Sequence, residues 1–514
     1  MQIFPILVVV VILAADSGLA ASEGDLALPA WGPATIAIAP ILAILLMVGL
    51  WMRWCRRRLG QGRSAHLIMI ADRLMHLARW LVLADYAAAV LLAGWLRTVR
   101  HTVGDLVLVD ELLTMLPPIL GAAALWWLHY PIDRALREAL LMRRLDLGKP
   151  VYPMPGRWRY VFRQLRLHIF LLLVPILLIL GSAEAISLGL ARLPDGPLPE
   201  WAGDAATFAV GLGVFLLAPL MARVLLSVRP LPEGPVRDDL EHICRHHRVR
   251  VREFLLWGTD GSMMNAAVMG LIGPLRYVLL TDALIETMTR RQVQAVMAHE
   301  VGHVRRHHMP WMVLSLLAVL MLSGILVSLP FLLSEPLRVR WDARAIPWIE
   351  GAATGVAALL ALIAFGWISR RFERQADTFA VQHLSRTGDD EADIPGDGQT
   401  VTAEAAFALH SALQTIARLN TVDPRRRSWR HGSIAWRQQY LNAIIGRPLD
   451  ALPIDRFIRR LKLAVIVVLV LGGGATALIE WRTRREAPPP TMHVTEFDRP
   501  GQTEPALHRR DPAP

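Results

Sequence analysis

Long apolar runs separated by short polar stretches dominate the pattern of this chain. Eight of them approach the length of about 18–20 residues that an α-helix needs to cross a bilayer. We therefore expect eight membrane spans, at 34–52, 79–97, 106–128, 167–190, 206–227, 310–334, 349–368 and 462–480. Asp85 interrupts the second run, and Asp110 and Glu111 interrupt the third. These acids are expected near span ends or against neighbouring helices, because an unpaired charge in lipid is costly.

The segments between the later spans have the mixed pattern of a small α+β domain. Val249–Trp257 and Tyr277–Leu280 are apolar runs of strand length, with the turn-forming cluster 258–262 between them. Thr289 is a suitable N-cap for a helix over Arg290–His303, with Gln292 placed to complete a capping box. The fold class predicted is a mainly α-helical polytopic membrane protein with a small α+β domain.

The same pattern divides the chain into five parts. Residues 1–21 resemble a signal peptide, since the apolar run from Ile3 to Ala15 is too short to span and small residues follow it. An uncleaved interfacial segment is the alternative. The other parts expected are a membrane region with about five spans at 22–228, a domain interrupted by two spans (310–334 and 349–368) at 229–445, the last span with its lead-in at 446–481, and a disordered tail at 482–514.

Composition and charge agree with a membrane protein. Hydrophobic residues make up 54% of the 514 residues, too many for an ordinary soluble chain. The net charge of +11 comes from arginines that flank the apolar runs. Attraction to anionic lipid headgroups explains them, so we expect the lipid bilayer and no nucleic acid as a partner.

The arginines also predict the topology. Arg53, Arg56, Arg57 and Arg58 follow the first span and place its C-terminal end in the cytoplasm. Counting spans then puts 228–309 and 369–461 on that same side, although the arginines after residue 481 run against this rule. Both cysteines, Cys55 and Cys244, would be cytoplasmic, so no disulfide framework is expected.

The most specific chemical feature is His299-Glu300-Val301-Gly302-His303. On a helix, two histidines four residues apart lie about 40° apart around the axis, so both imidazoles can reach one Zn²⁺. Glu300 beside them can act as the general base for an attacking water. The alternative is that this segment is only a polar stretch of an exposed helix.

A third ligand is needed, because catalytic zinc has three protein ligands and one open position. Glu373 and Asp377 share a helix face at spacing i, i+4. One carboxylate can bind the metal, while the other accepts the free N–H of a ligand histidine. Ordinary Arg–Glu pairing at a helix start is the alternative.

Three blocks resemble the membrane zinc metalloproteases of the CAAX prenyl protease and HtpX group. They are Asn265–His303, Ser369–Asp377 and Arg430–Arg437, and the resemblance covers about 230–445. In the third block Gly432 stands where that group has proline, which leaves the local backbone less fixed. The resemblance implies a zincin-like metalloprotease domain.

The resemblance also implies roles for single residues. His299, His303 and Glu373 would bind Zn²⁺, Glu300 would be the catalytic base and Asp377 would support a ligand. His431 and Arg437 would stabilise the oxyanion, and Asn265 with Ala266 would belong to a strand whose edge pairs with an extended peptide.

We therefore expect a zinc-dependent endopeptidase that hydrolyses membrane-associated or misfolded polypeptides in a bacterial inner membrane, with its site facing the cytoplasm. The alternatives are a sensor metalloprotease resembling the BlaR antirepressor group, an intramembrane protease, and a non-catalytic zinc-binding scaffold. The arginines that bracket the histidine motif oppose the intramembrane alternative.

Other histidines receive simpler interpretations. His242 and His246, at i and i+4, could hold a metal, but they are interpreted as the exposed face of a helix. The doublet His307-His308 is interpreted as the basic end of the motif helix.

Overall fold

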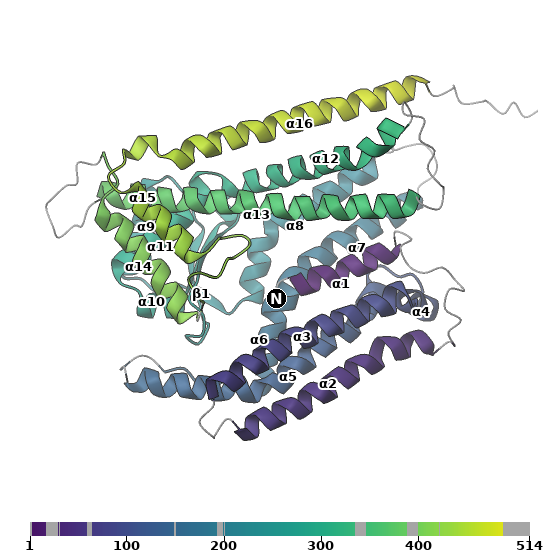
Figure 1. The fold of residues 1–514 in the computed structure, drawn as a ribbon, viewed down its shortest axis with the longest axis horizontal. Coiled ribbons are helices and arrows are strands. Elements are labelled where there is room, and N and C mark those ends of the chain that lie inside the picture. Colours follow the sequence, from purple (N-terminus) through teal and green to yellow (C-terminus); the bar gives the residue numbers. More distant parts are fainter. Residues whose placement is uncertain are drawn as a thin grey trace, which may run out of the picture. The chain divides into compact units, whose positions relative to one another are not determined.

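The computed structural model describes residues 3–16, 29, 31–58, 64–146, 148, 151–192, 199, 201–334, 346–387, 399–420 and 422–486. The expected cleavage region near residue 20 and residues 487–514 of the expected tail lie outside these residues, whereas 482–486, expected to be disordered, continue the last helix. The described part is mainly helical with one small sheet, which confirms the predicted fold class (Figure 1). Its helices before the sheet are α1 (Ile3–Ala14), α2 (Gly32–Arg58), α3 (Ser64–Leu91), α4 (Trp95–Val103), α5 (Val109–Asp146), α6 (Arg157–Leu165), α7 (Leu171–Ala191) and α8 (Ala202–Leu225).

Eight helices in the described residues are long and apolar enough to cross a membrane, the number expected. They are Gly32–Arg58, Leu67–Leu91, Val109–Ala139, Arg157–Ala191, Ala202–Leu225, His308–Val327, Ala352–Thr387 and Leu449–Leu478. The protein is therefore an integral multi-pass membrane protein. The expected second span, 79–97, was misplaced, because α3 ends at Leu91 and Gly94, at φ 72°, separates it from α4. A left-handed glycine stops a helix, and hydropathy alone does not detect it.

The acids that interrupt the third apolar run are paired within the N-terminal helices. Arg100 on α4 donates to Asp110 Oδ2 at 2.6 Å, to Glu111 Oε1 at 3.1 Å and to Asp16 Oδ1 at 2.6 Å. Asp110 and Glu111 are both buried at the start of α5. They face a neighbouring helix at a span end, as expected from the cost of an unpaired charge.

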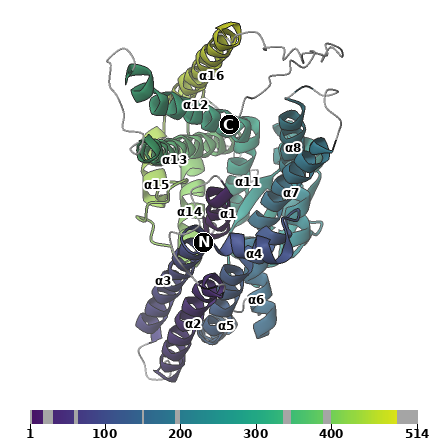
Figure 2. The ribbon, with the colours of Figure 1, turned by 90° about the vertical axis from the view of Figure 1, so that its right-hand side faces the viewer.

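Three helices of this N-terminal region pack side by side. Figure 2 shows α2, α3 and α5 together, and small residues allow their close approach. A Cβ on Gly121 of α5 would lie 3.1 Å from Ile41 Cγ2 on α2 and 3.3 Å from Val82 Cγ1 on α3. A larger residue at 121 would push these helices apart.

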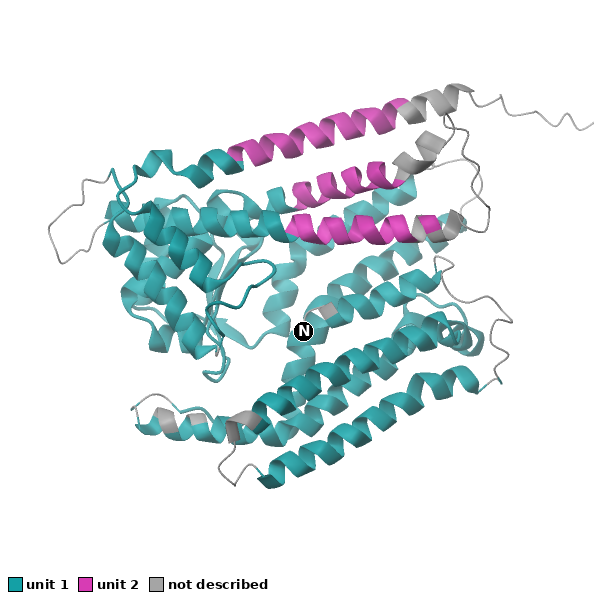
Figure 3. Cartoon of the chain, viewed as in Figure 1, with its two compact units in different colours: residues 1–312, 366–458 teal, residues 313–365, 459–514 magenta. Residues whose placement is uncertain are grey.

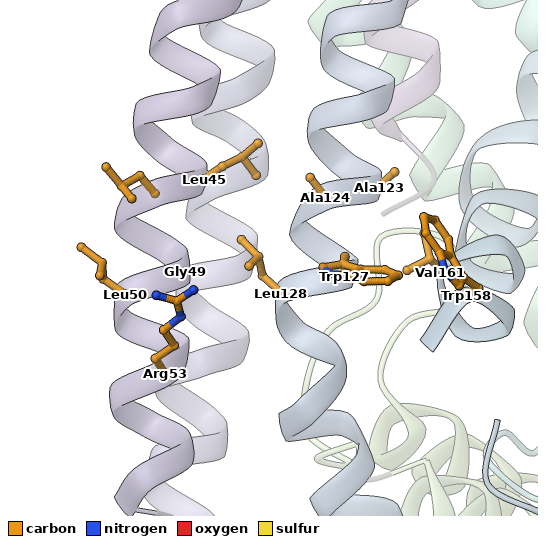
Figure 4. A pocket seen from close by; sticks show the side chains of 11 residues that line it. Leu45, Gly49, Leu50, Arg53, Ala123, Ala124, Trp127, Leu128, Trp158 and Val161 are labelled. Carbon is orange, nitrogen blue, oxygen red and sulfur yellow. The ribbon is translucent and has the colours of Figure 1, made fainter. Parts of the chain in front are cut away.

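A groove of about 590 Å³ opens between α2, α5 and α6 (Figure 4). Its walls are apolar except at one end, where the charged side chain is Arg53. Such a surface suits lipid chains with an anionic headgroup at the arginine. The lining residues are Leu45, Leu46, Gly49, Leu50, Arg53, Ala123, Ala124, Trp127, Leu128, Trp158 and Val161.

The small sheet has four strands in the order β1-β2-β4-β3. β2 and β4 are parallel, whereas β1 pairs antiparallel with β2 and β3 pairs antiparallel with β4. Gly270, at φ 104°, turns the chain between β3 and β4, and a Cβ there would lie 2.4 Å from the Leu275 carbonyl oxygen. The strands are β1 (Val228–Pro230), β2 (Glu253–Trp257), β3 (Ala266–Met269) and β4 (Tyr277–Thr281).

Both faces of β4 are covered, which explains its continuous apolar sequence. On one face Val278 and Leu280 pack with Leu240 of α9 and Met297 of α11. On the other face Tyr277 and Leu279 pack with Leu255 and with Leu226, which follows α8. The sheet therefore joins the end of the membrane helices to the motif helix.

Five of the shorter helices, α9, α10, α11, α14 and α15, gather by the sheet in Figure 1. α11 begins with the predicted capping box: Thr289 Oγ1 accepts from Gln292 N, and Gln292 Oε1 accepts from Thr289 N. The remaining helices are α9 (Pro235–His246), α10 (Asp282–Thr287), α11 (Arg290–Arg305), α12 (His308–Ser334), α13 (Ile346–Thr387), α14 (Ala403–Leu419), α15 (Ile434–Ile444) and α16 (Pro453–Glu486).

The chain forms two compact units, coloured in Figure 3. The first comprises 1–312 and 366–458, and contains the sheet and all the residues discussed below. The second comprises 313–365 and 459–514. Within it α16 approaches α12 closely, since a Cβ on Gly472 would lie 2.1 Å from Met321 Sδ.

Replacing Thr289 by alanine removes the side-chain acceptor of the capping box. We expect a loss of about 1 kcal/mol of stability, seen as a thermal-unfolding midpoint lower by roughly 2–4 °C in detergent. Thr289→Ser keeps the hydroxyl and should unfold near the wild-type midpoint. Equal losses in both variants would contradict the capping role.

Candidate metal centre

Two helices bring three metal-ligand side chains together. α11 carries His299 and His303 one turn apart, and α13 contributes Glu373. The two Nε2 atoms lie 3.2 Å apart. Glu373 Oε2 is 3.7 Å from His299 Nε2, and Glu373 Oε1 is 3.7 Å from His303 Nε2.

These distances fit a metal ion. Two nitrogens bound to tetrahedral Zn²⁺ at about 2.0–2.1 Å lie roughly 3.3 Å from each other. The described structure brings one ligand atom from each of the three residues within 4.8 Å of the others. Two imidazoles and a carboxylate are also the donor set of many catalytic zinc sites.

The second ring nitrogen of each ligand histidine has a partner that fixes its tautomer. His299 Nδ1 lies 2.9 Å from Asp377 Oδ1, so it donates its proton to that carboxylate. His303 Nδ1 lies 3.0 Å from His308 Nδ1, and His308 Nε2 lies 2.9 Å from Gln375 Oε1. Since the Gln375 oxygen accepts from Nε2–H, neutral His308 accepts at Nδ1 and His303 donates to it.

Both Nε2 atoms therefore present lone pairs at the same place. Two acceptors 3.2 Å apart, with a carboxylate beside them, repel one another unless a cation lies between them. Burial also lowers the pKa of His303 to about 4, which keeps this ring neutral and able to bind metal. For His299, burial opposes protonation, but the hydrogen bond and charge of Asp377 outweigh it and raise the pKa.

Asp377 is itself held by Arg437 of α15. The Arg437 Nε donates to Asp377 Oδ2 at 2.8 Å, and Nη2 donates to Oδ1. Asp377 is completely buried and Arg437 is nearly so. A bidentate pair of this kind fixes the carboxylate in one orientation, and through it the His299 ring.

His431 reaches the site from a loop. Its Nδ1 lies 2.9 Å from Glu373 Oε1, while 54% of its side chain remains exposed. The loop is closed by two backbone hydrogen bonds of 3.1 Å between Ser428 and Gly432. Gly432 has φ 75°, which proline cannot adopt, and it donates through an N–H that proline lacks. These two hydrogen bonds constrain the loop at the position where the CAAX prenyl protease and HtpX group has a proline.

Glu300 lies beside the free edge of the sheet. It is held in place by a hydrogen bond of 3.2 Å from Val268 N to its Oε2. β3 is an edge strand in the described sheet, and the Val268 N–H points away from β4. Because strand residues alternate, Ala266 presents its backbone to the same edge, whereas Asn265 is bonded to Thr281 on the inner side. Burial raises the pKa of the Glu300 carboxyl, which makes it a stronger base.

A glycine sets the spacing between the two ligand helices. A Cβ on Gly302 would lie 3.1 Å from the Cβ and Cδ1 of Phe379 on α13. Most real Cβ contacts are longer, so any larger residue at position 302 would force α11 and α13 apart. The glycine between His299 and His303 therefore lets Glu373 approach them.

The structure thus brings together His299, Glu300, His303, Glu373, Asp377, His431 and Arg437, with Ala266 on the adjacent edge. Sequence reasoning missed His308, Gln375 and Val268. The interpretation of His307-His308 as the basic end of the motif helix left out the contacts of His308, whose ring is buried and stacks on Phe372 with centroids 4.7 Å apart. Its position two residues before an apolar run gave a weak sign of burial at most.

Comparisons with known proteins find similarity to peptidases. Residues 230–394 match the model of peptidase family M48. Over 185 residues the chain is 30% identical to a CAAX prenyl protease 1 homolog of Arabidopsis thaliana, covering 34% of this chain and 43% of that protein. Over 200 residues it is 26% identical to a protease HtpX homolog of Aeropyrum pernix, covering 36% and 61%. The chain thus spans about half the length of the curated relatives it matches.

Among solved structures, that of S. mikatae Ste24p is similar at a TM-score of 0.42 and 17% identity, covering 80% of this chain and 99% of that one. The family match and the two curated relatives confirm the resemblance that the three sequence blocks indicated. The match of residues 230–394 to the M48 peptidase model, the eight apolar helices and the two protease relatives together support placing this chain with the membrane M48 metalloproteases, the group of CAAX prenyl protease and HtpX.

Proposed function

We propose that this protein is a zinc-dependent membrane endopeptidase that hydrolyses peptide bonds of membrane-associated or misfolded polypeptides. The observation that carries the proposal is the position of Glu300 between two elements of the site. It is adjacent in sequence to ligand His299 and it is bonded to Val268 on the free edge of β3. The carboxylate of Glu300, the proposed base, thus lies between the metal ligands and the strand edge that would bind a peptide.

Each residue has a role that follows from its contacts. His299, His303 and Glu373 would hold Zn²⁺, which when bound polarises a carbonyl and acidifies a water. An extended substrate would pair with the outward N–H and C=O groups of Ala266 and with the C=O of Val268, since the Val268 N–H already donates to Glu300. Glu300 would take the proton from the attacking water and deliver it to the leaving amine.

The two cationic residues would act differently. His431 is the exposed one, so we propose that it donates to the oxyanion that develops on the substrate carbonyl. Arg437 is buried in its bidentate pair with Asp377, and its Nη1 lies 3.6 Å from Glu373 Oε2. It would add positive charge to the site while fixing the ligand orientation.

The orientation in the membrane is also a proposal. Arg56, Arg57 and Arg58 end α2, which favours a cytoplasmic position for that end and for the M48 domain. A bacterial inner membrane and a role in protein quality control, as for HtpX-like proteases, suit this orientation and a site that binds backbone groups.

Glu300→Gln tests the catalytic base. We expect the variant to keep its zinc and to lose cleavage of an unfolded protein by at least about 100-fold, because glutamine cannot accept the proton. Cleavage and zinc content are measured on detergent-purified protein, with Glu138→Gln on α5 as the matched control, since 54% of the Glu138 side chain is exposed. If wild-type protein binds zinc and cleaves nothing, the chain is a scaffold and the proposal fails.

Asp377→Asn tests the support of His299. The variant keeps the shape of the side chain but loses the charge that orients the ring, and we expect zinc affinity to fall about 10–100-fold. Competition with a chelator measures this affinity. Asp105→Asn serves as the control, since Asp105 is 72% exposed and belongs to neither histidine cluster. Unchanged affinity in Asp377→Asn would remove Asp377 from the site.

His431→Ala separates oxyanion stabilisation from ligand support. If His431 donates to the oxyanion, kcat should fall about 100–1000-fold while KM and zinc content stay near wild type. A parallel loss of zinc would instead mean that His431 only orients Glu373.

A further inference from the structure

The structure has a second histidine cluster, which contains none of the residues assigned above. It consists of His246 and His247 at the end of α9 and His383 near the end of α13. One ring nitrogen from each of the three lies within 4.8 Å of the others. We propose that this cluster binds a second divalent transition-metal ion of the zinc class.

The geometry matches that of the first site. His247 Nε2 and His383 Nδ1 lie 3.1 Å apart, close to the 3.2 Å between the nitrogens of His299 and His303. The His246 ring centroid is 4.8 Å from that of His247 and 5.6 Å from that of His383. Three imidazoles can therefore surround one ion at ordinary Zn–N distances of about 2.0–2.1 Å.

The end of α9 explains how consecutive histidines converge. Side chains of neighbouring residues on a helix point about 100° apart and do not meet. The helix ends at His246, His247 is its C-cap at φ −89° and ψ 6°, and Arg248 is left-handed at φ 53°. The interpretation of His242 and His246 as a plain exposed face was therefore incomplete, since the chain turns at His247 and reaches α13.

The donor set favours a borderline metal over a hard cation. Among the residues that the structure describes, the cluster offers three imidazoles and no carboxylate, which suits Zn²⁺, Cu²⁺ or Ni²⁺ and not Mg²⁺ or Ca²⁺. The nearby Cys244 is buried, and burial raises the pKa of its thiol to about 12, so it is no competing thiolate.

Charges around the cluster are partly neutralised. Arg305 and Arg386 face His247, and Arg291 faces His383, which opposes binding of a cation. Arg386 is paired with Asp450 at 3.0 Å and Arg291 lies 3.8 Å from Glu404, so part of this opposition is offset. His383 is buried, but His246 is exposed, so an ion can enter from solvent and keep a water ligand.

The second ion would stabilise the arrangement of the first site. It would join α9 to α13, the helix that carries Glu373 and Asp377. The His247 ring packs on Phe379 with centroids 4.6 Å apart, and Phe379 contacts Gly302 between the two ligand histidines. The two clusters are thus separated by one layer of side chains.

The competing explanation is a hydrogen bond between two neutral rings, His247 and His383, without metal. Zinc stoichiometry distinguishes the two. Full-length protein in detergent is stripped with a chelator, reloaded with Zn²⁺ and desalted, and the metal is counted by mass spectrometry. We expect two ions per chain in the wild type and one in His246→Ala.

His242→Ala is the matched control, because His242 lies one turn before His246 on the same helix but is not in the cluster. It should keep two ions. In a His303→Ala background one ion should remain, and adding His246→Ala should remove it. Zinc should also raise the thermal-unfolding midpoint of His303→Ala but not of the double variant. One ion in the wild type, or two in His246→Ala, would overturn the proposal in favour of the hydrogen bond.

Discussion

The site depends on one electrostatic constraint: the lone pairs of His299 Nε2 and His303 Nε2 face each other across 3.2 Å. Asp377 accepts a hydrogen bond from Nδ1–H of His299. His308, which is oriented by Gln375, accepts one from Nδ1–H of His303. In the neutral rings both Nε2 atoms are thereby acceptors, and each lies 3.7 Å from an oxygen of Glu373. Without a cation this arrangement is strained by repulsion, and with one the same groups become a complete set of ligands.

Residues from distant parts of the chain hold the two histidine rings in this arrangement. Arg437 on α15 fixes Asp377, and Gln375 donates to Asp455 Oδ1 at 2.7 Å at the start of α16. The sheet positions α11 through the apolar contacts of β4, and Gly302 permits the close approach of α13. In this region, helices that precede the two apolar segments 310–334 and 349–368 in the sequence and helices that follow them together orient a few polar atoms.

The sequence predicted what is encoded over short distances. Four-residue spacing indicated His299 with His303 and Glu373 with Asp377, and a three-residue spacing indicated the capping box at Thr289. Hydropathy predicted eight long helices but not the break at Gly94, because a left-handed residue has no apolar signature. His308, Val268 and the His246–His247–His383 cluster depend on tertiary contacts and a helix terminus, and no spacing rule identifies them.

The free edge of β3 has a consequence for selectivity. Backbone N–H and C=O groups are common to all polypeptides, so an edge strand discriminates little between side chains. It can accept only a segment whose own backbone groups lack partners, since a folded strand or helix has already used them. A segment that must first open at a cost of about 4 kcal/mol is bound roughly a thousandfold less well than one already open. Under the proposed function, substrates would then be selected by the free energy that their local unfolding requires.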